Sequence, residues 1–273
     1  MASLSGKRIA LLEARMSGEI ASMVERFGGT AYSVPAVRET PVEQPHETTA
    51  FVDALCAGRF DVVVFMTGVG ASALLKEAEM RAQLDAALLA LRSATTVCRG
   101  PKPVSVLRRH DVQVDITAAE PHTTTELLDA LAAIDLDGKS VALVHYGERN
   151  DVATSALKQR GAAVHEICLY EWRLPDNVAP LERLVDEIIA GKVDAVAVTS
   201  QIQIRHLFEI ADKLAKVSAL TDALIRKTVV AAVGPVCAAA LRTYGVTAHV
   251  QPSHPKMGPM LLALSDYFDL TGR

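Results

Sequence analysis

Two glycines after an apolar run have a spacing that could bind a cofactor. The segment "DVVVFMTGVGASA" places Gly68, Gly70 and Ala73 at the spacing of the G-x-G-x-x-G/A fingerprint of dinucleotide-binding turns. Such a site also needs a carboxylate at the end of the next strand for the ribose. The next apolar run, "TTVCRGP", offers Arg99 there and no acid. We therefore interpret the glycines as a tight strand-to-helix turn rather than a nicotinamide or flavin site.

The other reactive side chains form no recognised catalytic or metal-binding pattern. The cysteines are far apart and never form C-x-x-C, which argues against a disulfide framework or a metal centre. The 8 histidines include no H-x-x-x-H pair, and no serine lies in G-x-S-x-G. We expect no metal and no cofactor.

Composition and charge describe an ordinary globular protein. A chain of 273 residues is more easily divided into two domains than packed into one. The net charge is −4 and the basic residues are scattered, so nucleic acid is not an expected partner. No window has the length and apolarity of a signal peptide or a membrane span, so we expect a cytoplasmic protein without a membrane partner.

The chain matches itself when shifted by about 133 residues, as duplicated proteins do. "GKRIALLEA" (6–14) matches "GKSVALVHY" (138–146), and "GRFDVVVFMTGVG" (58–70) matches "GKVDAVAVTSQIQ" (191–203). "GPKPVSVLRRHDVQVDI" (100–116) matches "GPVCAAALRTYGVTAHV" (234–250). Three blocks in the same order indicate a duplication, so the two halves should share one fold.

Within each half, short apolar runs alternate with helical segments. Strands that read as unbroken Val, Ile, Ala and Leu are buried on both faces, which is typical of a parallel sheet wrapped by helices. We predict two similar doubly wound, flavodoxin-like α/β domains. Ligands of such sheets bind beyond the carboxyl ends of the strands. The candidate loops are therefore 13–16, 67–72, 99–103, 145–150, 199–203 and 233–237. Two such domains with facing strand ends would enclose a ligand larger than a nucleotide.

The order of these blocks resembles the uroporphyrinogen-III synthase family over about residues 6–265. The most specific segment is "VVAAVGPVCAAALRTYGVTAHVQPSHPKMGPMLLAL", which is similar to the family's strand, Gly-Pro, helix, Gly and strand pattern. "DAVAVTSQIQIRHLF" and "DVVVFMTGVGASALL" resemble its two strand-to-helix turns. Arg15 falls where members commonly carry an arginine after the first strand, and Tyr170 where they carry a tyrosine before a connector.

The resemblance implies that the N-terminal segment belongs to the C-terminal domain, and it also implies an enzymatic activity. Residues 1–37 and 174–273 would form one domain and residues 42–167 the other, with extended connectors at 38–41 and 168–173. The implied activity is a cofactor-independent lyase reaction, in which hydroxymethylbilane is cyclised with inversion of ring D and loss of water. The substrate would be a linear tetrapyrrole. We also expect a monomer that makes transient contact with the preceding enzyme of the pathway.

The candidate site residues follow from the loops and the resemblance together. Tyr170 is the candidate general acid. Helix N-termini and nearby cations suit a substrate rich in carboxylates. The candidate substrate-binding residues are Arg15, Thr67, Gly68, Val69, Gly70, Lys102, Tyr146, Gly147, Thr199, Ser200, Gln201, Gly234, Pro235 and Val236. Serine and threonine at such points are also ordinary helix caps, so both roles stay open for them.

The sequence departs from the family pattern in three places. Val236-Cys237 stands where members often carry Thr-Thr, and Lys102-Pro103 where a threonine is frequent. Tyr146-Gly147 replaces an Arg-Gly. These departures keep a second hypothesis open, a non-catalytic member of the fold that binds a tetrapyrrole or another polyanion as a sensor. A periplasmic-type small-molecule receptor is a third, more distant hypothesis, which the lack of a signal sequence disfavours.

Overall fold

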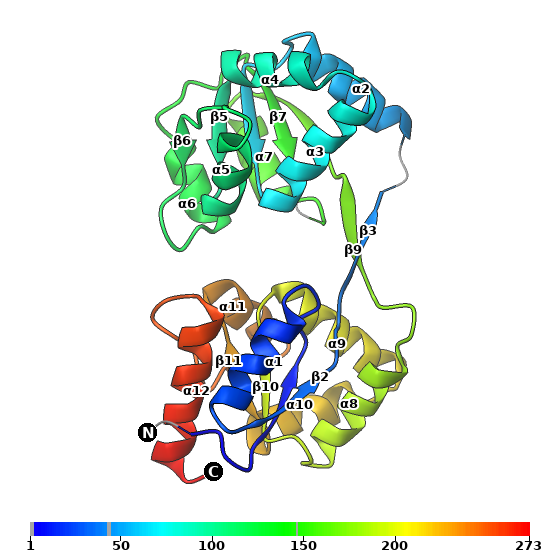
Figure 1. Ribbon diagram of the computed structural model, residues 1–273, viewed down its shortest axis with the longest axis vertical. Helices are drawn as coiled ribbons and strands as arrows, with labels where there is room; N and C mark the ends of the chain where they lie inside the picture. Colours follow the sequence, from blue (N-terminus) through cyan, green and yellow to red (C-terminus); the bar gives the residue numbers. More distant parts are fainter. Residues whose placement is uncertain (1–2, 43–44, 146) are drawn as a thin grey trace. The chain divides into compact units, whose positions relative to one another are not determined.

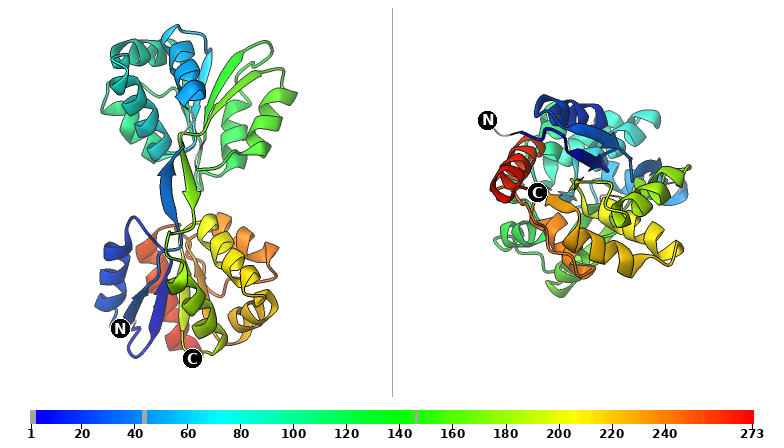
Figure 2. Two further views of the ribbon diagram at one scale, coloured as in Figure 1. Left: turned by 90° about the vertical axis from the view of Figure 1, so that its right-hand side faces the viewer. Right: turned by 90° about the horizontal axis from the view of Figure 1, so that it is seen from below.

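The chain folds into two compact units, and both ends of the sequence contribute to the first. Unit 1 comprises Met1–Arg38 with Arg173–Arg273, and unit 2 comprises Glu39–Trp172. The computed structural model describes residues 3–42, 45–145 and 147–273 (Figure 1). Each unit holds one parallel sheet with helices on both faces (Figures 1 and 2). The predicted α/β fold class with two doubly wound parallel sheets is confirmed.

Unit 2 is built around a five-stranded parallel sheet. Its elements are α2 (Pro45–Cys56), β4 (Val62–Phe65), α3 (Gly68–Met80), α4 (Leu84–Ser93), β5 (Thr95–Cys98), α5 (Pro101–Arg108), β6 (Ile116–Thr117), α6 (Thr124–Leu131), β7 (Ser140–Val144), α7 (Asp151–Gln159) and β8 (Ala163–Ile167). The strand order is β6-β5-β4-β7-β8. Alternate residues of a strand point to opposite faces, so α2 to α5 pack on Val63 and Phe65, while α6 and α7 pack on Val62 and Val64.

Unit 1 uses the first strands of the chain together with its C-terminal part. Its elements are β1 (Arg8–Leu11), α1 (Ser17–Arg26), β2 (Thr30–Ser33), α8 (Ala179–Ile189), β10 (Ala195–Val198), α9 (Gln201–Lys213), α10 (Val217–Arg226), β11 (Val229–Ala232), α11 (Pro235–Thr243) and α12 (Met257–Thr271). The order is β11-β10-β1-β2, with a bridge from Ala231 to Val250 beside β11. Helices α8 to α11 cover one face, and α1 and α12 cover the other.

The two sheets have corresponding strand orders, in which β1 and β2 take the places of β7 and β8. An aspartate shared by the two halves of the sequence has the same structural role in both. Asp61 accepts a hydrogen bond from the N–H of Ser140 at 2.8 Å, and Asp194 accepts one from the N–H of Arg8 at 2.8 Å. Each carboxylate thereby caps the start of the neighbouring parallel strand. This correspondence agrees with the duplication that the repeat predicts.

Two short strands lie outside both main sheets. β3 (Arg38–Pro41) and β9 (Tyr170–Arg173) pair with each other, and they lie at the points where the chain passes between the two units. The expected connectors, 38–41 and 168–173, contain these strands.

One strand is much shorter than the apolar pattern "VQVDIT" at 112–117 indicates. Only Ile116–Thr117 pairs in β6. The carboxylate of Asp115 accepts a hydrogen bond from the N–H of Thr96 at 2.7 Å. A side chain therefore takes a backbone donor at this edge of the sheet, and regular pairing begins only after it.

Candidate functional site

The turn between β4 and α3 is held by one threonine. Thr67 is the N-cap of α3, and its Oγ1 accepts a hydrogen bond from the N–H of Gly70 at 3.0 Å. The N–H of Gly70 is therefore engaged by the cap of its own helix. Among the described residues, nothing accepts from the N–H groups of Gly68 and Val69, which are unpaired as the first donors of a helix usually are.

The glycines of this turn lie in close contact with neighbouring loops. A Cβ on Gly68 would lie 3.1 Å from backbone and side-chain atoms of Lys102, and one on Gly70 would lie 3.0 Å from the carbonyl oxygen of His145. Both glycines are buried. Close packing of three carboxyl-end loops, rather than approach of a pyrophosphate, explains the G-x-G spacing.

Tyr170 meets this turn directly. Its hydroxyl lies 2.9 Å from Oγ1 of Thr67, and the tyrosine is only 5% exposed. Thr67 accepts from Gly70 through one lone pair and has another for the tyrosine hydroxyl. The phenol of the candidate acid is thus held beside the first turn of α3, where two backbone N–H groups remain unpaired.

Gly147 packs against the indole that follows Tyr170 on β9. Its φ is +77°, in the left-handed region that favours glycine, and a Cβ there would lie 2.4 Å from Cδ2 of Trp172. Gly147 also forms a bridge with Glu171. Lys102 lies exposed in the first turn of α5. The candidate Tyr146 lies outside the described residues.

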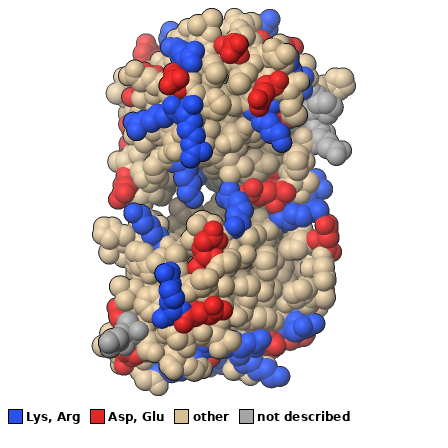
Figure 3. All heavy atoms as spheres, in the orientation of Figure 1, with Lys and Arg blue, Asp and Glu red and all other residues tan. Residues whose placement is uncertain are grey.

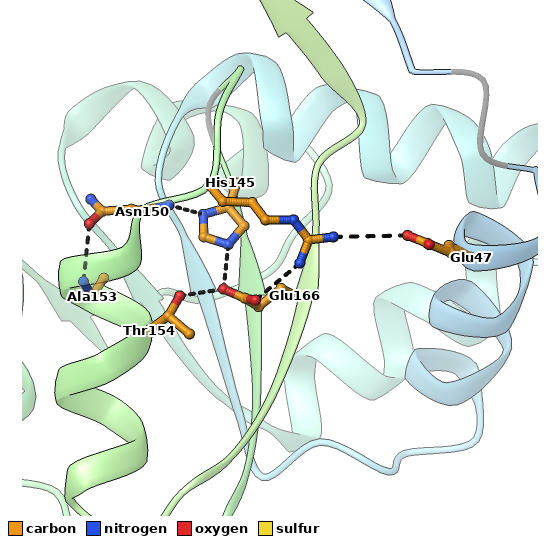
Figure 4. Close-up of polar contacts among 7 residues, drawn as sticks. Glu47, His145, Asn150, Ala153, Thr154 and Glu166 are labelled. Atoms are coloured by element: carbon orange, nitrogen blue, oxygen red, sulfur yellow. Dashed lines mark hydrogen bonds and ion pairs between the residues drawn. The ribbon is translucent and has the colours of Figure 1, made fainter.

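A polar network, buried at His145 and exposed at Arg149, lies at the same loop (Figure 4). His145 is fully buried, and its Nε2 lies 3.0 Å from Oε1 of Glu166. Arg149 donates to Oε2 of Glu166 at 3.1 Å and lies 4.0 Å from Glu47. The Thr154 hydroxyl donates to Oε1 of Glu166. Glu166, which is partly buried, was not foreseen from the sequence, because nothing in the strand AVHEI marks its carboxylate as the partner of His145.

Burial and partners shift the acid–base behaviour of this network. Burial lowers the pKa of His145 below its ordinary value, although Glu166 acts in the opposite direction. Burial raises the pKa of Glu166, but hydrogen bonds from Thr154 and His145 outweigh it and hold that pKa below the usual range. The arrangement therefore favours a neutral imidazole beside a charged carboxylate.

The corresponding turn of unit 1 is closed by a carboxylate from β1's carboxyl end. The hydroxyl of Thr199 donates to Glu13, and Nε2 of Gln203 donates to the same carboxylate at 3.2 Å. Oε1 of Gln203 accepts from the N–H of Thr199 at 2.8 Å and of Ser200 at 3.3 Å. Arg15 is exposed, and its N–H donates to Oε1 of Glu13 at 3.2 Å. Glu13 was not among the expected site residues, although its place directly after a buried strand was a usable signal.

The Gly-Pro turn of unit 1 carries the remaining candidates. A Cβ on Gly234 would lie 2.9 Å from Pro255, so the glycine is again required by packing. Pro235 and Val236 are exposed at the start of α11, with Val236 44% exposed. Cys237 is buried, and burial raises the pKa of its thiol to about 12. Neither Val236 nor Cys237 replaces the hydroxyls that the family pattern carries here.

The predicted residues thus fall into two groups, each at the carboxyl edge of its own sheet. In unit 2 the group is Thr67, Gly68, Val69, Gly70, Lys102, Gly147 and Tyr170, and in unit 1 it is Arg15, Thr199, Ser200, Gln201, Gly234, Pro235 and Val236. Donors and cations dominate both groups, while Glu13 and Glu166 are already engaged by protein groups. Such an edge can hold carboxylates and position a phenol.

Other kinds of site find no support in the part of the chain that the structure describes. No group of His, Cys, Asp and Glu there could hold a metal ion. No helix among the same residues has the length and apolar character needed to cross a membrane. Lys and Arg lie interspersed with Asp and Glu over the face shown in Figure 3, so this face carries no extended basic field.

Fold and site together define a class of protein with two doubly wound α/β units and a donor-rich loop cluster at each sheet's carboxyl edge. Comparison with known proteins identifies the family. The family model described as "Uroporphyrinogen-III synthase HemD" matches residues 18–261, and the chain belongs to this family. The predicted family is confirmed.

Individual relatives agree in fold and extent. YjjA of Bacillus subtilis (strain 168) is 32% identical over 275 residues, which cover 97% of each chain, and its name states no activity. The structure of a mutant uroporphyrinogen III synthase from the extremely thermophilic bacterium Thermus thermophilus is 27% identical with a TM-score of 0.78, and the match covers 97% of this chain and all of that one. The uroporphyrinogen-III synthetase of Helicobacter pylori 26695, at 14% identity and a TM-score of 0.54 over 95% of this chain and 99% of that one, shows the fold alone.

Proposed function

We propose that this chain is a uroporphyrinogen-III synthase, a lyase that cyclises hydroxymethylbilane with inversion of ring D and loss of water. The observation that carries the proposal is membership of this family over residues 18–261, which include the carboxyl-edge loops of both units except the first. The proposal includes a cytoplasmic, monomeric enzyme that needs no cofactor and makes only transient contact with the enzyme that precedes it.

The reaction requires positioning more than strong acid–base chemistry. The C–O bond of the hydroxymethyl group breaks and releases water, which leaves an azafulvene cation. The substituted carbon of ring D attacks this cation to form a spiro intermediate, which fragments and recloses with loss of a proton. Spontaneous closure through the unsubstituted carbon gives the wrong isomer. An enzyme that holds the chain in the productive geometry therefore supplies most of the selectivity.

The carboxylates of the substrate have suitable partners in unit 2. The unpaired N–H groups of Gly68 and Val69 open a 13-residue helix, where backbone donors and the helix dipole favour an anion. Lys102 is exposed beside this turn, and its side chain makes no ion pair with any of the described residues. Carboxylates bound here would lie next to the hydroxyl of Tyr170, which in this proposal donates a proton to the departing hydroxyl group, so that it leaves as water.

The direct test supplies freshly made hydroxymethylbilane, oxidises the product to porphyrin and separates the isomers. We expect type III porphyrin at a rate proportional to protein concentration. Type I porphyrin alone, formed at the spontaneous rate, would refute the proposed activity. The Tyr170→Phe variant should turn over at least several-fold more slowly, with Tyr267→Phe as a control on α12 of the other unit. Wild-type turnover by the Tyr170 variant would remove the phenol from the mechanism.

A second function is favoured by the Val236-Cys237 departure. The buried thiol of Cys237 and the exposed valine offer no hydroxyl donor at the first turn of α11. A non-catalytic member that binds a tetrapyrrole as a sensor would keep the donor-rich edges but not the turnover. Saturable binding of uroporphyrin without formation of the type III isomer would favour this function.

A further inference from the structure

The imidazole of His145 has a fixed tautomer. Its Nδ1 lies 3.2 Å from the backbone nitrogen of Asn150, and a backbone N–H can only donate. Nδ1 therefore carries the lone pair, and the proton is on Nε2, which donates to Oε1 of Glu166 at 3.0 Å (Figure 4). Both ring nitrogens are satisfied only when the buried imidazole is neutral.

Through these two bonds His145 joins the loop after β7 to three other elements. Glu166 belongs to β8 and also accepts from Thr154 on α7. Asn150 caps α7, with its Oδ1 accepting from Ala153 at 3.0 Å, and its amide donates to Thr124 on α6 at 2.8 Å. A polar network in which every member is paired restrains the described residues of this loop, His145 and 147–150.

The same loop contacts a neighbour of Thr67 and a neighbour of Tyr170. At its start, the carbonyl oxygen of His145 lies against Gly70, whose N–H is bound by Thr67. Two residues later, Gly147 lies against the indole of Trp172 on β9, the strand that carries Tyr170. A shift of this loop would therefore move the threonine side and the tyrosine side of the pair relative to each other.

We propose that His145 is a positioning residue, whose neutral imidazole fixes the loop after β7 and thereby sets the geometry of Thr67 and Tyr170. This role rests on the proposed function, because it acts through the candidate acid of that reaction. Protonation at Nδ1 would place an N–H against the N–H of Asn150 and release the loop.

The charged groups around the imidazole determine the pH at which the loop is released. Glu166 on β8 and Asp151 on α7 favour the protonated ring, whereas burial and Arg149 in the loop oppose it. Glu47 on α2 lies behind Arg149 at 4.0 Å. Because the balance lowers the pKa of His145, the loop stays fixed at neutral pH and is released only below the ordinary histidine range, near 6.5.

The test uses an internal probe, because the chain contains 1 tryptophan and Trp172 is the residue that packs on Gly147. We expect the emission of wild-type Trp172 to change on acidification with a midpoint below 6.5. His145→Asn keeps an acceptor near Nδ1 without a titrating ring, so this transition should disappear. His165→Asn, a change at the exposed histidine next to Glu166, is the matched control and should keep the transition.

The activity measurement then separates positioning from folding. We expect His145→Asn to lower kcat about tenfold, with KM changed less than about twofold, because a small misplacement of a reacting group costs rate. Glu166→Gln should move the midpoint of the Trp172 emission change to lower pH, because the carboxylate that it removes favours the protonated imidazole. This variant keeps the proposal testable if His145→Asn does not fold.

Two results would overturn the proposal. One is an acid transition of Trp172 that persists in His145→Asn or does not move in Glu166→Gln. The other is a loss of activity in His145→Asn that matches only the loss of folded protein. A wild-type protein that makes no type III isomer would instead refute the proposed function, while the emission measurement would still report on the loop.

Discussion

The hydroxyl of Thr67 makes two interactions at the turn of α3, and their coupling can be measured. Its Oγ1 accepts from the N–H of buried Gly70 at 3.0 Å and lies 2.9 Å from the hydroxyl of Tyr170. Thr67→Val keeps the shape of the side chain but removes both hydrogen bonds. Tyr170→Phe removes the bond between the two hydroxyls and leaves the bond from Gly70 to Thr67 in place. The two single variants therefore share one lost interaction.

The structure sets the expected magnitudes. Thr67→Val leaves the N–H of a buried glycine without its cap, which costs about 1–3 kcal/mol. Tyr170→Phe loses one hydrogen bond between neutral groups, worth about 0.5–1.5 kcal/mol. Because the shared bond is lost in each single variant, the double variant should be less destabilised than the sum by about 0.5–1.5 kcal/mol.

Urea unfolding followed by Trp172 emission measures this cycle, because this tryptophan belongs to unit 2 and therefore reports on the unit that contains the pair. Thr67→Ser keeps the hydroxyl and is the matched control for the cap. Additive single variants would show that the two hydroxyls are not coupled. A Thr67→Val protein no less stable than Thr67→Ser would refute the role of the cap.

Three further predictions follow from single sites. Gly147→Ala should destabilise unit 2 by about 1–3 kcal/mol more than Gly138→Ala in urea unfolding, since both have positive φ but only the first Cβ would overlap an indole; equal losses would contradict this. His145, His206 and His249 have pKa values lowered by burial, so the unfolded state binds more protons once the pH falls below about 6.5. The unfolding free energy summed over both units should then fall by up to about 4.1 kcal/mol per pH unit, and a flat profile between about pH 6.5 and 5 would contradict it. If the proposed activity holds, Arg15→Ala should raise KM about tenfold with little change in kcat, and an unchanged KM would remove this arginine from the substrate site.

Much of the fold could be predicted because the repeat preserves residues with a backbone role. Asp61 and Asp194 cap the start of a neighbouring strand, and Gly234 lies too close to Pro255 for a side chain. The same residue type is needed wherever the same turn recurs, so both halves of the sequence retain it. The short β6 was not predictable in this way, because the carboxylate of Asp115 takes a donor that the apolar pattern assigns to a longer strand.

The pairing of side chains in the site was less predictable than their position. A parallel sheet brings the ends of its strands to one edge, so the loops of the site could be predicted from the apolar runs alone. Which side chains meet there depends on rotamers and loop paths. Thr67 and Tyr170 are separated by 103 residues, and Glu13 and Thr199 by 186, and no local pattern records either contact.

The two equivalent turns have diverged in a way that bears on where an anionic ligand would bind. In unit 1 the hydroxyl of Thr199 and the amide of Gln203 already donate to Glu13, so a second carboxylate would meet a like charge and occupied donors. In unit 2 the N-cap Thr67, which corresponds to Ser200, faces the neutral hydroxyl of Tyr170, and the N–H groups that follow are unpaired among the described residues. An anion therefore costs less electrostatic energy at the turn of unit 2. Replacing Glu13 with glutamine would remove that difference without changing the shape of the turn, so substrate affinity should rise only if carboxylates also bind at unit 1.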